Sequence, residues 1–202
     1  MGICYLVGAG DFYGQITKSA DDIIIAADGG YDSLIRHGYT PDLFVGDFDS
    51  TSYEIPRSIK SVRHPKEKDE TDMFLAYKEG VDLGFCDFVM LGATGGRLDH
   101  TYANLSLLLY AKERGHNVTV MDENGIVICL KNESISLAGK PGATFSVFAI
   151  GAEARGVSIK DAKYEVENAT LSPAFPLGVS NEFISHSAKI SVDDGALLVI
   201  AE

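Results

Sequence analysis

The chain lacks tryptophan and has only three cysteines among its 202 residues, and these cysteines form no recognisable site. Cys4, Cys86 and Cys129 lie far apart in apolar runs, without the CxxC or Cys/His spacing of a zinc site. An odd number of cysteines also argues against a secreted scaffold in which all cysteines are paired in disulfides. The sequence therefore predicts buried, reduced thiols and argues against both a zinc module and a disulfide-stapled fold.

Positive charge is scarce. Seventeen lysines and arginines stand against 29 aspartates and glutamates, which gives a formal net charge of −12. Nucleic acid and anionic membranes both need a basic face, so we expect neither as a partner. Phosphate ligands stay possible, because a bound Mg²⁺ can reverse the local sign of the charge.

Long hydrophobic runs are missing as well. No apolar stretch approaches the ~20 residues that a membrane span requires. The N-terminal sequence MGICYLVGAGD has no basic start and too short an apolar run for a signal peptide. We therefore expect a cytoplasmic protein.

Residues 1–123 alternate between strand and helix patterns, which predicts an α/β domain. Short continuous apolar runs, typical of strands buried on both faces, occupy residues 3–7, 23–27, 43–46, 88–91 and 118–121, with a weaker one at 61–63. Helices are predicted for residues 30–37, 71–83 and 101–114, each followed by a glycine that ends it. Such alternation predicts a mostly parallel sheet with helices on both faces.

Residues 124–202 have a different texture, with short β-rich segments separated by Gly, Pro, Asn and Asp. The predicted strands are residues 126–130, 134–137, 144–150, 164–167, 189–192 and 196–200. Closely spaced short strands without helical periodicity predict an antiparallel β-sandwich or a small barrel.

Charged loops follow the predicted strands of the first domain. They are ADGG (27–30), GDFDS (46–50), KDETD (68–72) and GGRLDH (95–100). Ligands of open α/β sheets bind beyond the carboxyl ends of the strands. We therefore expect Asp28, Asp47, Asp49, Arg97 and Asp99 to converge on one cleft.

GDFDS and KDETD favour a metal or phosphate site. In GDFDS an extended segment would point Asp47 and Asp49 the same way, although a simple Asx turn with Ser50 is an alternative. Asp69 and Asp72 share a face at a helix start, where acids also serve only to complement the helix dipole. Because GDFDS is expected at the same edge of the sheet, we favour metal binding for Asp69 and Asp72.

The remaining motifs are less specific. The glycines of ADGG allow a ligand to approach the backbone, and VGAGDFYG (7–14) is either a phosphate-cradling loop or a plain glycine turn. Arg97 offers a planar fork for phosphate oxygens, with a structural Arg97–Asp99 pair as the alternative. His100 is either a base or an orienting residue.

Taken in order, the motifs ADGG, PDLFVGDFDS (41–50), KDETDMFLA (68–76), GATGGRLDHTYANL (92–105) and GVSNEF (178–183) resemble those of the bacterial thiamine pyrophosphokinases. The resemblance implies a Rossmann-like α/β ATP-binding catalytic domain over residues 1–123. It also implies a thiamine-binding β-sandwich over residues 124–202. The resemblance further implies a homodimer with the thiamine pocket at the interface.

The same resemblance implies that ATP and thiamine give thiamine diphosphate and AMP, with Mg²⁺ as cofactor. Carried over by motif, the metal ligands are Asp47, Asp49 and Asp72. The catalytic residues are Asp72, Arg97 and Asp99. The ATP-binding residues are Asp28, Gly29, Asp47, Asp49, Asp69, Thr71, Thr94 and Arg97.

For thiamine, the resemblance implies Asp99, Asn104, Ser180 and Asn181, with Phe183 or another aromatic beside the rings. Some relatives use a tryptophan there, which this chain cannot supply. Three other functions fit the motifs: a diphosphokinase with another acceptor such as a hydroxymethylpterin, a metal-dependent phosphohydrolase, and a non-catalytic nucleotide- or thiamine-binding protein.

Overall fold

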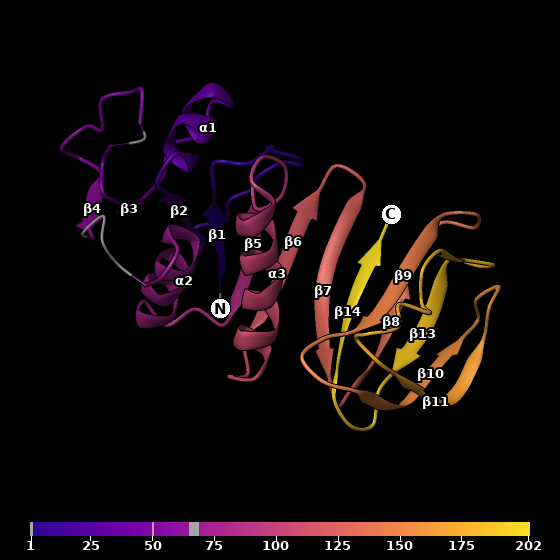
Figure 1. The fold of residues 1–202 in the computed structure, drawn as a ribbon. Helices are drawn as coiled ribbons and strands as arrows, with labels where there is room; N and C mark the ends of the chain where they lie inside the picture. The colour runs from indigo at the N-terminus through magenta and orange to yellow at the C-terminus, as the bar shows by residue number, and fades with distance from the viewer. Residues whose placement is uncertain (1, 50, 65–68) are drawn as a thin grey trace. The chain divides into compact units, whose positions relative to one another are not determined.

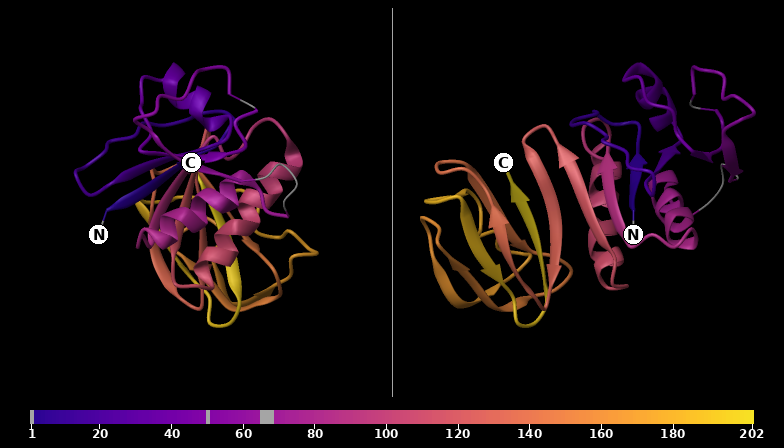
Figure 2. Two further views of the ribbon diagram at one scale, coloured as in Figure 1. Left: turned by 90° about the vertical axis from the view of Figure 1, so that its left-hand side faces the viewer. Right: turned by 180° about the vertical axis from the view of Figure 1, so that it is seen from behind.

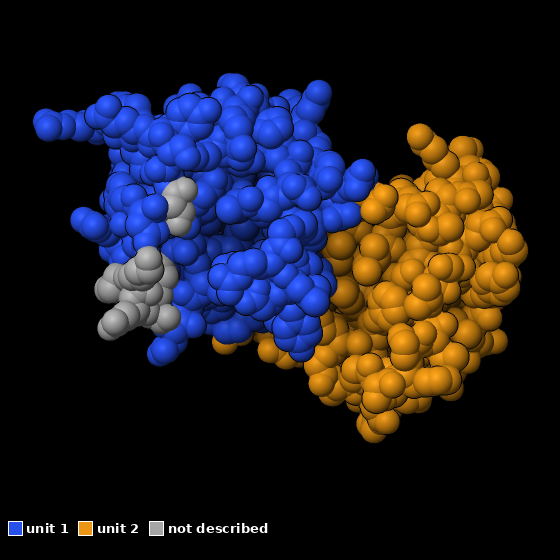
Figure 3. Space-filling model, turned by 45° about the horizontal axis from the view of Figure 1, so that its top comes forward, with its two compact units in different colours: residues 1–111, 115–123 blue, residues 112–114, 124–202 orange. Residues whose placement is uncertain are grey.

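The computed structural model describes residues 2–49, 51–64 and 69–202, which form two compact units. The first unit comprises residues 1–111 and 115–123, and the second comprises residues 112–114 and 124–202 (Figure 3). Ser50 of GDFDS and Lys68 of KDETD lie outside the described residues.

The first unit is built on a parallel sheet with the strand order β6-β5-β1-β2-β3-β4 (Figure 1). Its strands are β1 (Ile3–Val7), β2 (Ile23–Ala27), β3 (Leu43–Gly46), β4 (Lys60–Arg63), β5 (Asp87–Leu91) and β6 (Asn117–Asp122). Most positions of β1, β2 and β3 are buried. Continuous apolar runs suit such strands because both faces are covered by helices.

In the described part of the first unit, three helices cover the sheet: α1 (Gly30–Arg36), α2 (Asp72–Asp82) and α3 (Leu98–Lys112). Tyr31 and Leu34 of α1 pack with Tyr5 and Val7 of β1. Gly80 of α2 instead lies against Cys4 and Phe88, whose side chains belong to the opposite face. Helix α3 joins α2 there, since the rings of Phe74 and Tyr110 lie 4.9 Å apart (Figure 1). The predicted fold, a mostly parallel sheet with helices on both faces, is confirmed.

The second unit is an antiparallel β-sandwich, as predicted (Figure 2). One layer has the order β12-β9-β14-β7 and the other β11-β10-β13-β8. Its strands are β7 (Gly125–Lys131), β8 (Ser134–Ala138), β9 (Thr144–Ala149), β10 (Ala154–Lys160), β11 (Val166–Leu171), β12 (Asn181–Glu182), β13 (Ser187–Ser191) and β14 (Ala196–Ala201). Inward-facing residues of both layers, such as Val147, Val157, Ile190 and Val199, share one core.

Several predicted boundaries are wrong. The strand predicted at residues 164–167 begins only at Val166, and the sequence analysis missed β10 altogether. Strand β10 contains Gly156 at φ +66°, and its ladder to β11 is irregular there, so its sequence lacks a clean alternation. Helix α3 starts at Leu98 rather than Thr101.

The cysteines are free. Burial raises the pKa of the Cys4 thiol, and it raises the pKa of Cys129 to about 11, which keeps both protonated and unreactive. Cys86 is only half-buried, so the prediction of three buried thiols is correct for two. In the described ranges, no helix is long and apolar enough to cross a membrane.

Asp22 connects the start of the sheet to the loop before β2. Its carboxylate accepts hydrogen bonds from the backbone N–H groups of Ile3 at 2.6 Å and Ser19 at 2.7 Å. These bonds, the one from Ile3 above all, lower the pKa of Asp22 below its ordinary value. Its contribution to stability is therefore present above the unfolded-state pKa of ~3.9 and is lost as the pH falls through the lower folded-state value.

We expect Asp22→Asn to be less stable than the unsubstituted protein at pH 7. The variant should lose less of its unfolding free energy between pH 7 and pH 3, because it has no such carboxylate to protonate. Urea unfolding across this pH range measures the effect, with Asp21→Asn at the exposed neighbouring position as the control. Parallel pH curves for Asp22→Asn and the unsubstituted protein would contradict the assignment.

Candidate active site

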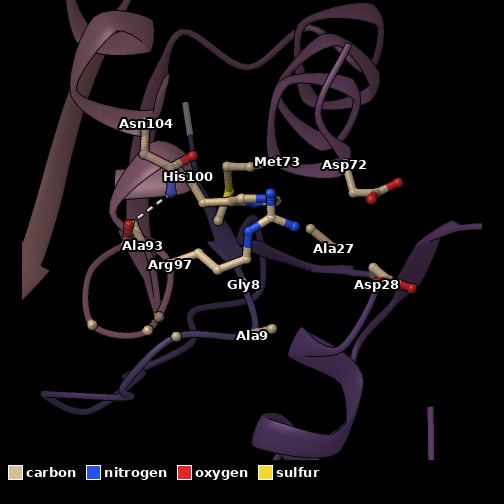
Figure 4. Close-up of a pocket in the computed structure, with 14 residues that line it drawn as sticks. Gly8, Ala9, Ala27, Asp28, Asp72, Met73, Ala93, Arg97, His100 and Asn104 are labelled. Atoms are coloured by element: carbon tan, nitrogen blue, oxygen red, sulfur yellow. Dashed lines mark hydrogen bonds between the residues drawn. The ribbon is translucent and has the colours of Figure 1, made fainter. Parts of the chain in front are cut away.

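A cavity of about 300 Å³ lies at the carboxyl edge of the parallel sheet of the first unit. Strand β1 is central there: the chain runs from β1 to β4 toward one edge, then returns to β5 on the other side of β1. The cavity is lined by the loops after β1, β2 and β5 and by the starts of α2 and α3 (Figure 4). A reversal of strand order is where open α/β sheets bind ligands.

The loops after β1 and β5 form the floor by pairing backbone to backbone. The N–H of Gly8 donates to Leu91 O at 2.9 Å, that of Gly10 to Gly92 O at 2.9 Å, and that of Asp11 to Thr94 O at 3.0 Å. A Cβ at Gly8 would lie 2.6 Å from Gly92 O. Gly8 and Gly10 of VGAGDFYG are thus required by this close approach of two loops, which favours the glycine-turn interpretation.

Two side chains fix the loop after β5. Buried Asn104 donates from Nδ2 to Ala93 O at 2.7 Å (Figure 4), and the Thr94 hydroxyl donates to the carboxylate of Asp122. The sequence analysis did not single out Asp122. It is the last residue of β6, so the rule that found the other acidic strand ends would also have found it.

Three carboxylates gather at the ends of β2 and β3. One oxygen from each of Asp28, Asp47 and Asp49 lies within 4.8 Å of the other two. Asp28 itself has φ +48°, and its backbone N–H donates to Val45 O at 2.8 Å. The structure thus groups Asp47 and Asp49 with Asp28, whereas Asp72 lines the adjacent cavity (Figure 4).

The extended geometry that we expected for GDFDS is wrong. Phe48 has φ +73°, and the N–H of Asp49 donates to Asp47 Oδ1 at 3.0 Å, which closes an Asx turn. The turn, rather than strand alternation, brings the two carboxylates together. The Phe48 ring lies 4.7 Å from the Phe44 ring, and the Arg63 guanidinium lies 5.4 Å above it. These contacts offset the ~1–2 kcal/mol that a left-handed residue costs.

Arg97 and Asp99 form an exposed ion pair. Arg97 donates from Nε to Asp99 Oδ1 at 3.1 Å and from Nη2 to Oδ2 at 2.6 Å. The hydrogen bond from Arg97 is the main reason why the pKa of Asp99 is lowered, and the same contact raises that of Arg97. Arg97 lines the cavity together with His100, whereas Asp99 lines a separate open hollow with Leu98 and Tyr102.

The start of α2 contributes Asp72 and Thr71 in different ways. Asp72 lines the cavity, whereas the Thr71 hydroxyl accepts from the N–H of Phe74 at 3.2 Å and so caps the helix. Asp69 is exposed and is not among the described residues that line the cavity. Gly29 is the N-cap of α1.

The C-terminal motif GVSNEF lies in the second unit. Ser180 is exposed with φ +58°, and its N–H donates to Ser146 Oγ at 3.1 Å. Asn181 is buried, and its amide is held by the backbone of Tyr164. Phe183 is fully buried against Phe145, so our expectation of a ring-stacking role for Phe183 is wrong: its ring belongs to the core of the sandwich.

The first unit therefore offers a cavity lined by Asp28, Asp72 and Arg97, and Asp28 also belongs to a cluster of three carboxylates with Asp47 and Asp49. Carboxylates are the oxygen ligands that Mg²⁺ takes from proteins, and an arginine fork matches phosphate oxygens. Such a cleft at the edge of a parallel sheet is typical of α/β phosphotransferases, whose catalysis depends on positioning and charge neutralisation.

Comparison with known proteins gives the family. The family model described as "Thiamin pyrophosphokinase, catalytic domain" matches residues 14–120, and "Thiamin pyrophosphokinase, vitamin B1 binding domain" matches residues 131–197. The chain belongs to the thiamine pyrophosphokinase family, and it is an enzyme of the transferase class. The family identification made from the sequence is confirmed.

Individual relatives agree. The chain is 26% identical over 182 residues to "Thiamine pyrophosphokinase" of Bacillus subtilis (strain 168), covering 87% of this chain and 85% of the relative. It is 28% identical over 170 residues to "Thiamin pyrophosphokinase 1" of Caenorhabditis elegans, covering 78% and 70%.

Solved structures share the fold. Thiamine pyrophosphokinase from B. subtilis has a TM-score of 0.87 at 21% identity, covering 100% of this chain and 99% of that one. The enzyme from Geobacillus thermodenitrificans has a TM-score of 0.85 at 25% identity, covering 99% and 97%.

The hydrogen bond between Thr94 and Asp122 should stabilise the site loop measurably. A hydrogen bond to a charged group is worth ~1.5–3 kcal/mol, so we expect Thr94→Val to cost about 1–2 kcal/mol of unfolding free energy. The same substitution made on top of Asp122→Ala should cost less than about 0.5 kcal/mol, because the acceptor is already gone. Denaturant unfolding of the four proteins measures the coupling, and additive costs would contradict it.

Proposed function

We propose that this enzyme transfers the pyrophosphoryl group of ATP to the hydroxyl of thiamine, giving thiamine diphosphate and AMP in a Mg²⁺-dependent reaction. The observation that carries the proposal is the cluster of Asp28, Asp47 and Asp49 beside the arginine-bearing cavity, in a chain that matches both family models. The relatives' names state that they are thiamine pyrophosphokinases.

The donor set fits a magnesium ion. Mg²⁺ takes carboxylate oxygens at ~2.0–2.1 Å, so two ligands on opposite sides of one ion lie ~4 Å apart. Oxygens of Asp28, Asp47 and Asp49 within 4.8 Å of one another are close to that spacing. These residues would hold the ion, with Asp72 at the adjacent cavity wall. When bound, Mg²⁺ would neutralise charge on the phosphate oxygens.

Arg97 is proposed to hold the polyphosphate. Its guanidinium faces the cavity and keeps donors available beyond those that it gives to Asp99, because an arginine has five N–H groups. Asp99 orients that fork. A carboxylate whose pKa is lowered by an arginine is a weak base, so Asp99 is poorly suited to accept a proton.

In the proposed reaction the thiamine hydroxyl oxygen attacks the β-phosphorus, and the bond from that phosphorus to the oxygen bridging the α-phosphate breaks. AMP leaves with that oxygen, and the hydroxyl proton passes to Asp72, which lines the cavity, or to water. A loose transition state needs little help from a base. In this proposal the ATP site is completed by five further residues: Asp28, Gly29, Asp69, Thr71 and Thr94.

The acceptor side is assigned to the second unit. Ser180 and Asn181 are proposed to bind thiamine. Asp99 and Asn104, which belong to the first unit, are proposed as thiamine-binding residues on the family resemblance alone. The match of residues 131–197 to the vitamin B1 binding domain supports the assignment of the acceptor side to the second unit. The family resemblance adds a homodimer with the pocket at its interface, and the free cysteines suit a cytoplasmic location.

The first experiment is ³¹P NMR of the purified enzyme with Mg-ATP, with and without thiamine. Thiamine-dependent formation of AMP and thiamine diphosphate is expected. ADP or free phosphate without thiamine would indicate a simple kinase or a phosphohydrolase instead. Turnover with a hydroxymethylpterin in place of thiamine would reassign the acceptor, and tight binding without turnover would leave a binding protein.

We expect Asp47→Asn and Asp49→Asn each to lower kcat by at least about a hundredfold, the scale seen when charge stabilisation of a transition state is lost. Their folding should be intact, because both side chains lie in a surface turn. Steady-state kinetics and circular dichroism measure the two effects. Asp82→Asn, an exposed position at the end of α2, is the matched control. Full activity of both variants would remove GDFDS from the site.

Ser180→Ala should raise the KM for thiamine by about threefold to tenfold and leave that for ATP within about twofold, as expected for the loss of one hydrogen bond. Ser180→Gly, which accepts φ +58° without strain, separates loss of the hydroxyl from strain in the backbone. Equal rises in both KM values would count against a C-terminal thiamine pocket.

A further inference from the structure

The segment that ends with strand β4 concentrates positive charge in an acidic chain. Residues 57–63, RSIKSVR, contain three basic residues and no acid, although the whole chain has 17 basic residues against 29 acidic ones. Arg63 is the last residue of β4, and β4 is the outer strand of the parallel sheet (Figure 1). An exposed cation therefore stands at the same carboxyl edge of the sheet as the acidic site.

Arg63 and Asp28 are the two neighbours of Gly46 across the sheet. Arg63 is paired with Gly46 in the register of β3 and β4, and on the other side a Cβ at Gly46 would lie 3.3 Å from the Cβ of Asp28. Two strand spacings, or ~10 Å, separate the backbones of Asp28 and Arg63. The positive end of β4 thus adjoins the strand ends at which the three carboxylates gather.

The side chain of Arg63 is oriented by the turn that carries Asp47 and Asp49. Its guanidinium lies 5.4 Å from the centroid of the Phe48 ring, and its Nη2 donates to the backbone oxygen of Asp47 at 3.5 Å. Among the described residues, Arg63 forms no ion pair with a carboxylate. A guanidinium stacked by its face keeps N–H donors at its edge, and an arginine has five. Arg63 is therefore oriented without being neutralised.

The order of the strands sets a direction along this edge. The cavity lies at the ends of β5, β1 and β2, and its walls include the apolar side chains of Ala27 and Met73. The three carboxylates follow at the ends of β2 and β3. Arg63 comes last, at the end of β4, and it does not line the cavity.

We infer that Arg63 is a specificity-determining residue that binds the terminal phosphate of ATP. The inference rests on the proposed function. In this arrangement the nucleoside occupies the cavity, Arg97 holds the phosphates nearest to it, and the terminal phosphate reaches the end of β4. An arginine fork matches phosphate oxygens, so Arg63 selects a triphosphate over a diphosphate, which ends before β4.

Isothermal titration calorimetry with two unreactive nucleotides and Mg²⁺ tests the inference. In α,β-methylene-ATP and α,β-methylene-ADP a methylene group replaces the bridging oxygen at which the proposed reaction breaks the chain. Arg63→Gln should weaken the binding of α,β-methylene-ATP about fivefold to thirtyfold and leave that of α,β-methylene-ADP within about twofold. Arg63→Lys, which keeps the charge, should weaken α,β-methylene-ATP by less than about fivefold.

Lys60→Gln is the matched control. It removes one positive charge from the same strand, but Lys60 is aligned with Leu43 at the start of β3, far from the carboxyl edge. Both nucleotides should bind this variant within about twofold of the unsubstituted enzyme, because exposed charges act weakly at that distance. A thermal melt of each variant checks that it is folded.

A role of Arg63 in supporting the turn alone has a different signature. Loss of the contact with Phe48 would then disturb Asp47 and Asp49, so Arg63→Gln would bind Mn²⁺ more weakly in the absence of nucleotide and would weaken both nucleotides equally. We expect unreduced Mn²⁺ binding, measured by electron paramagnetic resonance, because the carboxylates are the metal ligands in this proposal.

Failure of this inference is distinguishable from failure of the proposed function. If the unsubstituted enzyme makes thiamine diphosphate but Arg63→Gln weakens both nucleotides equally, or neither, the Arg63 inference is overturned and the proposed function stands. If the unsubstituted enzyme shows no thiamine-dependent products, the proposed function fails. The calorimetry needs no acceptor, so a selective loss of α,β-methylene-ATP binding would still support the phosphate contact, and its absence would overturn that contact as well.

Discussion

The backbone pairing between the loops after β1 and β5 is the constraint on which the rest of the site depends. Two strand ends at the reversal of the sheet order are joined by hydrogen bonds at 2.9–3.0 Å, and a side chain at Gly8 or Gly10 would collide with the carbonyl of Gly92 or Thr94. Because the two loops are joined, they form the floor of the cavity. The loop after β5 is thereby fixed in position, and it leads directly to Arg97. A glycine-rich strand end is commonly interpreted as a phosphate-binding loop. Here glycine is required first of all because the two loop backbones approach too closely for a side chain.

Electrostatics imposes the second constraint. A chain with a net charge of −12 gathers three carboxylates within 4.8 Å of one another, and such a group repels itself unless a cation is shared. The turn at Phe48 keeps two of them together at the cost of a left-handed backbone, which Phe44 and Arg63 offset by packing on its ring. Strain at a polar strand end, maintained by neighbouring aromatic packing, is more easily explained by a ligand than by stability alone.

The sequence was sufficient for the fold class because the buried strands of the first unit are continuous apolar runs and its helices end at glycines. It also gathered Asp28, Asp47 and Asp49 at one edge, since parallel strands share their carboxyl ends. It could not supply the turn at Phe48, because a positive φ at a phenylalanine has no signal in local propensity. The sequence also could not show which aromatic side chains pack in the core. Phe183 was therefore expected at the thiamine pocket, although its ring packs on Phe145 in the core of the sandwich.

The two units differ in the kind of chemistry that their cavities can recognise. The cavity of the first unit is lined by the charged side chains of Asp28, Asp72 and Arg97 as well as by small apolar residues and Met73. That of the second is bounded mostly by aliphatic side chains, with one exposed tyrosine, Tyr164, at its wall. A triphosphate would lose its solvation without compensation in the second cavity, whereas Asp28, Asp72 and Arg97 give the first cavity groups that can hold a metal-bound phosphate. The solvation of a triphosphate therefore supports the proposed placement of ATP in the first unit, in addition to the match of residues 14–120 to the catalytic-domain model.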